Sequence, residues 1–157
     1  MPRLPLLSLL FATLAPFAMA GDLAPRPGWA VHDSEKSYGD LVKSVRSAVK
    51  ANGMIVVTQA GPTGAAAKRG ITIPGNRVIG VFNNDFAVKV LGHSTAAMIE
   101  APVRFYVTED ADGSATLSYK LPSHVFAPYM DEGGAGLVAL AAELDETFAA
   151  IAADALK

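Results

Sequence analysis

Three stretches of the chain place apolar side chains at intervals of three and four residues, the spacing of an amphipathic helix. The first stretch starts after Ser37, a capping residue, and ends at Asn52-Gly53, where glycine can take a left-handed conformation. The second has Asn84 or Asp85 as its predicted cap. The predicted helices are residues 37–52, 84–98 and 137–156.

Short runs of β-branched and aromatic residues predict five strands between and before these helices. Asp110-Ala111-Asp112-Gly113 joins two of the runs and is typical of a hairpin turn. Residues 61–76 and 123–136 predict irregular connections, the first with room for one helical turn around residues 65–68. The predicted strands are residues 29–35, 54–59, 77–83, 103–108 and 115–121.

The order of the elements is strand, helix, strand, strand, helix, hairpin, helix. Hairpin-linked strands favour an antiparallel sheet, and amphipathic helices need an apolar face to cover. The sequence therefore predicts an α+β fold, a two-layer sandwich in which helices cover a mostly antiparallel sheet. An uncovered edge strand of such a sheet can pair with a second copy, so a homo-oligomer is one expectation.

Four segments follow one another along the predicted elements: NGMIVV at 52–57, VIGVFN at 78–83, EAPVRFY at 100–106 and SYKLP at 118–122. In this order they resemble the DUF302 family of domains of unknown function. The resemblance extends over residues 30–156 and implies a fold similar to one half of the TATA-box-binding protein, β-α-β4-α, here with an extra helix after the third strand. It implies neither DNA binding nor a known activity, because a fold does not fix a function.

The N-terminus has the three parts of a secretory signal peptide. Arg3 precedes an apolar stretch at residues 4–17, and Ala18-Met19-Ala20 supplies a cleavage site after Ala20. The stretch is shorter than the about 20 residues that a spanning helix requires. We therefore expect a signal peptide at 1–20, a flexible lead-in at 21–28 and one domain at 29–157, periplasmic or secreted and without a membrane span after cleavage.

Composition excludes several function classes. Removing Arg3 with the leader leaves 12 basic and 15 acidic residues, a formal charge of −3, which is the wrong sign for a nucleic-acid binder. The chain has no cysteine, so it has no disulfide, thiolate nucleophile or zinc–thiolate site. Hydrophobic residues make up 51% and charged residues 18%, which is typical of a globular domain.

Several polar residues fall at predicted strand ends, where they can surround an apolar cleft. Glu100 and Arg104 flank a proline and can form a charge-assisted pair. A carboxylate, a guanidinium and two phenols suit a small polar ligand, although the same residues also suit a structural ion pair and half-buried tyrosines. The candidate ligand-binding residues are Asn83, Asn84, Glu100, Arg104, Tyr119 and Tyr129.

The leading hypothesis is an exported accessory module that binds a small molecule or a partner protein without catalysis. A second is a metal or haem-related redox accessory protein that uses His93, His124 or Met98, although their spacings do not match one helix face, and the methionines also suit a core. A third is a small hydrolase or isomerase with Glu100 or Asp85 as general base beside a histidine. The sequence indicates no particular cofactor.

Overall fold

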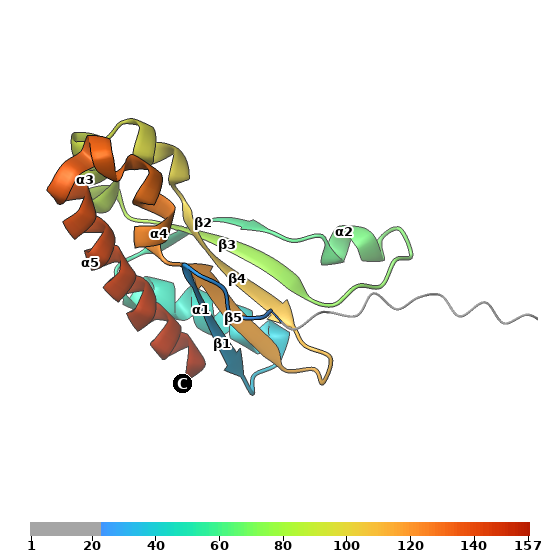
Figure 1. The fold of residues 1–157 in the computed structure, drawn as a ribbon. Helices are drawn as coiled ribbons and strands as arrows, with labels where there is room; N and C mark the ends of the chain where they lie inside the picture. The colour runs from blue at the N-terminus through green and yellow to red at the C-terminus, as the bar shows by residue number, and fades with distance from the viewer. Residues whose placement is uncertain (1–22) are drawn as a thin grey trace, which may run out of the picture.

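The computed structural model describes residues 23–157, so the predicted signal peptide and its cleavage after Ala20 lie outside the described residues. Five antiparallel strands form one sheet in the order β1-β5-β4-β3-β2, which leaves β1 and β2 at its edges (Figure 1). The strands are β1 Trp29–Ser34, β2 Ile55–Ala60, β3 Asn76–Phe82, β4 Val103–Glu109 and β5 Ala115–Lys120.

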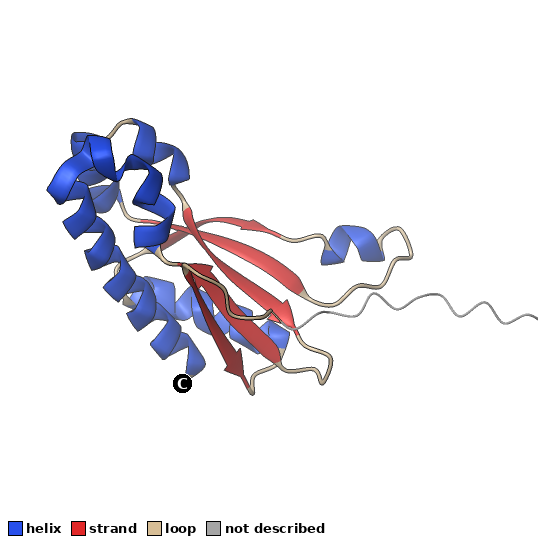
Figure 2. Cartoon of the chain, viewed as in Figure 1, coloured by secondary structure: helices blue, strands red, loops and turns tan. Residues whose placement is uncertain are grey.

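The helices gather on one side of this sheet, apart from α2, which projects beyond the ends of β2 and β3 (Figure 2). The predicted α+β sandwich is confirmed. The α-helices are α1 Tyr38–Ala51, α2 Thr63–Ala67, α3 Asn84–His93, α4 Pro122–Phe126 and α5 Met130–Leu156; the 3-10 helices are η1 Ala96–Glu100 and η2 Ala127–Tyr129. No helix within residues 23–157 combines the length and hydropathy needed to cross a membrane.

The core lies between the helices and one face of the sheet, which we term the covered face. On β4, every second residue points into this core, because successive side chains of a strand alternate between faces. Phe105 is 0% exposed and stacks on Phe148 of α5 with ring centroids 4.6 Å apart. Tyr119 of β5 contacts both rings. This aromatic cluster joins the sheet to α5.

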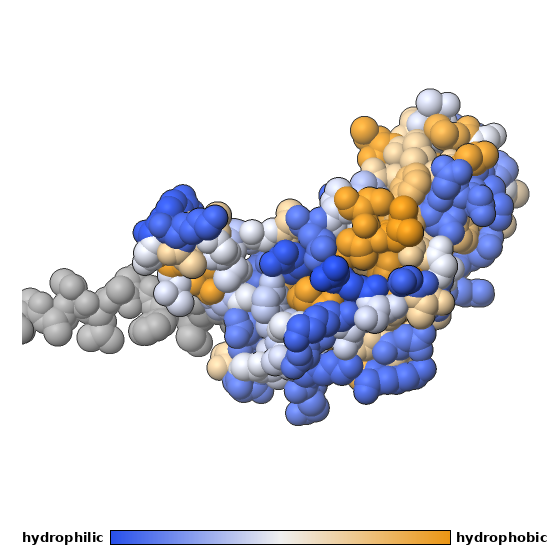
Figure 3. All heavy atoms as spheres, turned by 180° about the vertical axis from the view of Figure 1, so that it is seen from behind, coloured by the Kyte–Doolittle hydropathy of each residue, from blue (hydrophilic) through white to orange (hydrophobic). Residues whose placement is uncertain are grey.

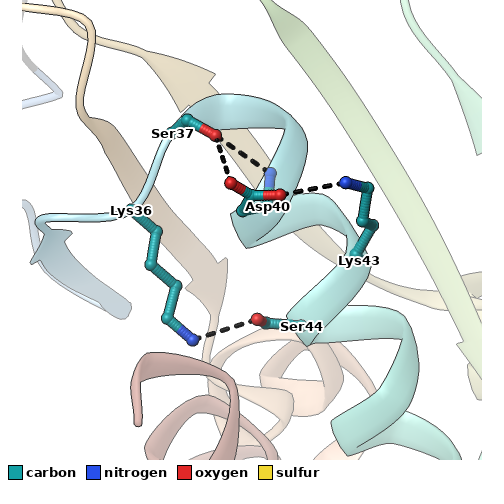
Figure 4. Close-up of polar contacts among 5 residues, drawn as sticks. All are labelled: Lys36, Ser37, Asp40, Lys43 and Ser44. Atoms are coloured by element: carbon teal, nitrogen blue, oxygen red, sulfur yellow. Dashed lines mark hydrogen bonds and ion pairs between the residues drawn. The ribbon is translucent and has the colours of Figure 1, made fainter.

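The first turn of α1 is held by the predicted cap (Figure 4). The Ser37 hydroxyl accepts a hydrogen bond from the Asp40 backbone N–H at 3.3 Å and donates one to the Asp40 carboxylate at 2.9 Å. Lys43 pairs with Asp40 at 2.9 Å. The Lys36 ammonium donates to Ser44 at 3.0 Å and to the Ala155 carbonyl at 2.9 Å, which ties the start of α1 to the end of α5.

The helix predicted at residues 84–98 starts at Asn84 as predicted, but its end and its capping residue differ from the prediction. It stops at His93, because Ser94 is extended and its buried hydroxyl accepts a hydrogen bond from Ala97 N at 2.9 Å, which starts η1. The cap is Asn83, whose side-chain oxygen accepts from the first backbone N–H groups, and neither Asn84 nor Asp85 takes that place.

The segment 123–136 is helical where an irregular connection was predicted. Its glycines and Pro128 lower helix propensity, but α4 packs on α5, where Ser123 N donates to Asp145, and buries Phe126 in the core. The start of α5 is held by the hydrogen bond between Ser94 and Glu132. Packing therefore overrides local preference here. Only Gly134, with φ 58° and ψ −160°, interrupts the helical backbone of α5.

Candidate functional site

We term the face of the sheet opposite to the helices the open face. It carries the residues that alternate with the core residues along β4. On β4, Val103, Phe105 and Val107 are buried in the core, whereas Arg104 and Tyr106 point to the open face. A pocket of about 430 Å³ lies there. Its lining residues are Trp29, Asn76, Val78, Glu100, Val103, Arg104, Tyr106, Tyr119, Lys120 and Val125.

The cations Arg104 and Lys120 line this pocket together with the indole ring of Trp29. Trp29 of β1 is directly opposite Lys120 of β5, and the Lys120 ammonium lies 5.8 Å from the indole centroid. Arg26 lies 5.2 Å from the same ring. Within residues 23–157, neither Lys120 nor Arg104 takes part in an ion pair. The pocket thus offers two cations that are not held in ion pairs, one of them next to an aromatic surface.

Tyr106 and Asn76 form a fixed polar group on the neighbouring strands. Val78 pairs with Tyr106 across β3 and β4, and the Asn76 side-chain amide donates a hydrogen bond to the Tyr106 hydroxyl. The hydroxyl proton of Tyr106 is therefore free to be donated to a bound molecule. The side chain of Val78 adds apolar surface beside it.

Glu100 brings a carboxylate to the pocket from the end of η1. Its Oε1 accepts a hydrogen bond from the Tyr129 hydroxyl at 2.8 Å. This hydrogen bond raises the pKa of Tyr129, with smaller contributions from desolvation and from the negative charges of Glu100 and Glu132. The carboxylate is oriented by the phenol, and its other oxygen can accept a hydrogen bond from a ligand.

The expected pairing of Glu100 with Arg104 is not formed: in the described part of the chain no ion pair joins them. Both still line the same pocket, and Tyr129 reaches it only through Glu100. Tyr119 borders the pocket, but its ring lies in the core and is 3% exposed. Burial raises the pKa of Tyr119, and the negative charge of Asp145 raises it further.

The two predicted asparagines lie outside this pocket. The Asn83 side chain accepts hydrogen bonds from Asp85 N at 2.8 Å and Phe86 N at 3.2 Å, and donates one to the Gly53 carbonyl at 2.9 Å. Asn84 is exposed in the first turn of α3. The amide of Asn83 therefore fixes the start of α3 to the loop before β2.

The candidate metal ligands are spread over separate places. His93, at the end of α3, lies against Gly136 of α5, and His124 of α4 lies against Gly28 before β1. Met98 packs against the core. Among residues 23–157, no three histidine or carboxylate side chains come close enough to hold a metal ion. Asp85, the other candidate base, is exposed in the first turn of α3.

Sequence reasoning missed the residues that give the pocket its character, which are Trp29, Asn76, Tyr106 and Lys120. A signal was present in the alternation of the strands. In β4 and β5, Tyr106 and Lys120 occupy the alternate positions to the core residues, so they share the face of Arg104. Alternation alone does not give the strand order, and the strand order makes these positions neighbours.

Residues 30–155 match the family model of DUF302, a domain of unknown function. The chain belongs to the DUF302 family. The resemblance seen in the four sequence segments is thereby confirmed. No curated protein matches this DUF302 chain.

Among solved structures, this DUF302 chain is similar to the crystal structure of an uncharacterized conserved protein DUF302 from Bacillus stearothermophilus. The two share 16% sequence identity, with 84% of this chain and 100% of that chain covered and a TM-score of 0.72. At this identity the likeness shows the fold alone. It carries no residue role from one protein to the other.

Proposed function

We propose that this DUF302 protein is a binding module and that its open-face pocket binds a small organic anion with an apolar body. The observation that carries the proposal is one pocket of about 430 Å³ that Arg104 and Lys120 both line and in which Lys120 lies beside Trp29. That volume lies in the range of known small-molecule sites, which are mostly apolar with a few oriented polar groups.

The charges of the lining residues support an anion with a single negative charge. Arg104 offers a planar fork of donors that suits a carboxylate, and Lys120 adds a second cation. Glu100 is the only carboxylate among the lining residues, and it would repel a second negative group. It favours instead a ligand with a hydroxyl or ammonium group that can donate to it.

Intrinsic fluorescence tests the proposal directly, because Trp29 is the sole tryptophan of the chain. Benzoate serves as the probe, with benzyl alcohol and benzylamine as neutral and cationic analogues of the same size. We expect benzoate to change the Trp29 emission in a saturable way, and benzylamine to bind at least tenfold more weakly, because a charge-assisted hydrogen bond is worth roughly 1.5 to 3 kcal/mol.

The Arg104→Gln variant should bind benzoate about tenfold more weakly or worse. Lys89→Gln is the matched control, because Lys89 is an exposed cation on α3 outside the pocket and should leave benzoate affinity unchanged. Equal affinity for all three probes, or equal loss in both variants, would contradict anion recognition at this pocket.

We also propose that the protein acts after export, in the periplasm or the medium. The support is the leader pattern of residues 1–20. N-terminal sequencing of the protein recovered from each fraction of its own cells tests this. A chain that begins at Gly21 outside the cytoplasm is the expected result, and an intact N-terminus in the cytosol would contradict it.

A further inference from the structure

A second surface lies on the other side of the molecule, at the edge of the sheet formed by β2. Among the described strands, β2 pairs with β3 alone, so one row of its backbone N–H and C=O groups has no strand partner. Ile55 and Val57 are large apolar residues that remain 58% and 45% exposed on this edge. Exposed, apolar edge strands are surfaces on which another chain can add a strand.

A groove runs between this edge and α1. It has a volume of about 510 Å³, and its apolar part comes from the end of α1 and the start of β2. The space-filling view from behind, where α1 and β2 face the viewer, shows exposed apolar atoms bordered by strongly hydrophilic ones (Figure 3). The lining residues are Lys43, Arg46, Ser47, Val49, Lys50, Met54, Ile55 and Val56.

The groove is basic in a chain whose formal charge is −2. Lys43, Arg46 and Lys50 are spaced by three and four residues, which places them along one face of α1, and no carboxylate lines the groove. Asp40 of α1 already pairs with Lys43 at 2.9 Å. Asp154, which accepts a hydrogen bond from Asn52 at the end of α1, pairs with Lys157. Arg46 and Lys50 have no ion-pair partner among residues 23–157.

We propose that this groove binds an extended segment of a partner protein in which acidic and apolar side chains alternate. The segment would pair with the first residues of β2, where Val56 faces α1 and Ile55, the residue before it, points to the opposite face of the sheet. Its carboxylates, on the side of α1, would meet Arg46 and Lys50, and its apolar side chains would lie beside the exposed Ile55 on the other side. The strand gives affinity through its main chain, and alternate side chains give selectivity. This site is separate from the open-face pocket and does not depend on the function proposed for it.

The geometry favours such a partner over a second copy of this chain. Two-fold pairing of β2 with another β2 would place the two α1 helices on the same side of a continuous sheet, so that their cations would face each other. The register of β2 with β3 also shifts between Val56 and Thr58, a bulge that interrupts a long regular edge. A short segment needs only the residues before that bulge.

Fluorescence anisotropy with a labelled heptapeptide of alternating glutamate and valine tests the proposal. We expect saturable binding that the double change Arg46→Glu and Lys50→Glu weakens at least tenfold. The matched control is Lys68→Glu with Arg69→Glu, which makes the same charge change at the exposed end of α2 and should alter affinity less than twofold. Equal loss in both double variants would overturn the proposal in favour of unspecific charge attraction.

Two further probes separate docking from a folding defect. A heptapeptide of alternating lysine and valine should bind the Arg46→Glu, Lys50→Glu protein and not the natural one, which requires that variant to be folded. N-methylation of the amides along one edge of the acidic peptide should abolish binding, and methylation along the other edge should be tolerated. Tolerance of both methylations, or a stable protein dimer that excludes the peptide, would overturn strand addition by a partner.

Discussion

The two faces of the sheet differ in burial, and the residues of β4 show this within one strand. Phe105 is enclosed on the covered face by Phe148 and Tyr119, while Arg104, the residue before it, points to the open face without an ion-pair partner in the described chain. Phe105 therefore contributes buried apolar area to the stability of the fold, whereas Arg104 contributes a charge at the surface. The covered face holds the fold together, and the open face carries the pocket that we propose to bind an anion.

This difference teaches how a domain of this size can keep a charged pocket without losing stability. Arg104 and Lys120 keep their charges in contact with water, so they carry little desolvation cost. The apolar area that stabilises the fold is buried elsewhere, under α1 and α5. Changes on the two faces should consequently be separable, and the following experiments rank from the largest expected effect to the smallest.

Removing the ring of Phe105 should have the largest effect on stability. Phe105→Ala leaves a cavity between the sheet and Phe148, and such changes in a core cost about 3 to 5 kcal/mol. Equilibrium urea unfolding followed by circular dichroism measures the loss. A loss below about 1 kcal/mol would show that the covered face is not the source of stability.

Asn83→Ala should cost about 1 to 2 kcal/mol, because the side chain caps α3 and also donates to the Gly53 carbonyl. The same urea titration measures this change. Benzoate affinity should stay as it is, because Asn83 lies outside the open-face pocket. Weaker benzoate binding with unchanged stability would contradict the capping role and would indicate that Asn83 contacts the ligand.

Tyr119→Phe should reduce the sensitivity of the fold to alkali. The pKa of Tyr119 is raised in the folded protein, so its phenol contributes stability that is complete below about pH 10 and is lost as the pH rises through the folded-state pKa. The phenylalanine variant lacks this loss. Urea unfolding at about pH 7 and above about pH 10 compares the two proteins, and an equal decline in both would exclude the buried phenol as the cause.

Arg104→Gln should have the smallest effect on stability, within about 0.5 kcal/mol, because the side chain is exposed and unpaired among the described residues. Urea unfolding of this variant beside Phe105→Ala compares adjacent residues of one strand. A loss above about 2 kcal/mol would show that the open face also carries the fold, and that its cations have a structural role.

The element order was readable from the sequence because periodicity reports which side of each element is buried. The caps at Ser37 and Gly53 and the hairpin at Gly113 follow local rules that act over a few residues. The end of α3 did not follow, because Ser94 is held by Glu132 of α5, a contact 38 positions away. The helical start of α5 at residues 130–136 likewise contacts the end of α3, where His93 lies against Gly136.

For the site, residue type and position at strand ends sufficed to select Glu100 and Arg104, which line the pocket together. They did not reveal that Tyr129 binds Glu100 or that Asn83 is a cap, because a phenol and an amide suit a ligand or the backbone equally well. Trp29 and Lys120 are neighbours only because β1 pairs with β5, a strand far from it in the sequence.

The sequence by itself determined the elements, the apolar stripes and the charge of this DUF302 protein, because these depend on residues a few positions apart. The tertiary structure alone decided the strand order, and with it which side chains share the open face and which edge stays unpaired. Side chains from β1, β3, β4 and β5 become neighbours only when these strands pair in one sheet over the core. Recognition surfaces depend on such distant neighbours, whereas the cap of α1 and the hairpin turn follow local rules.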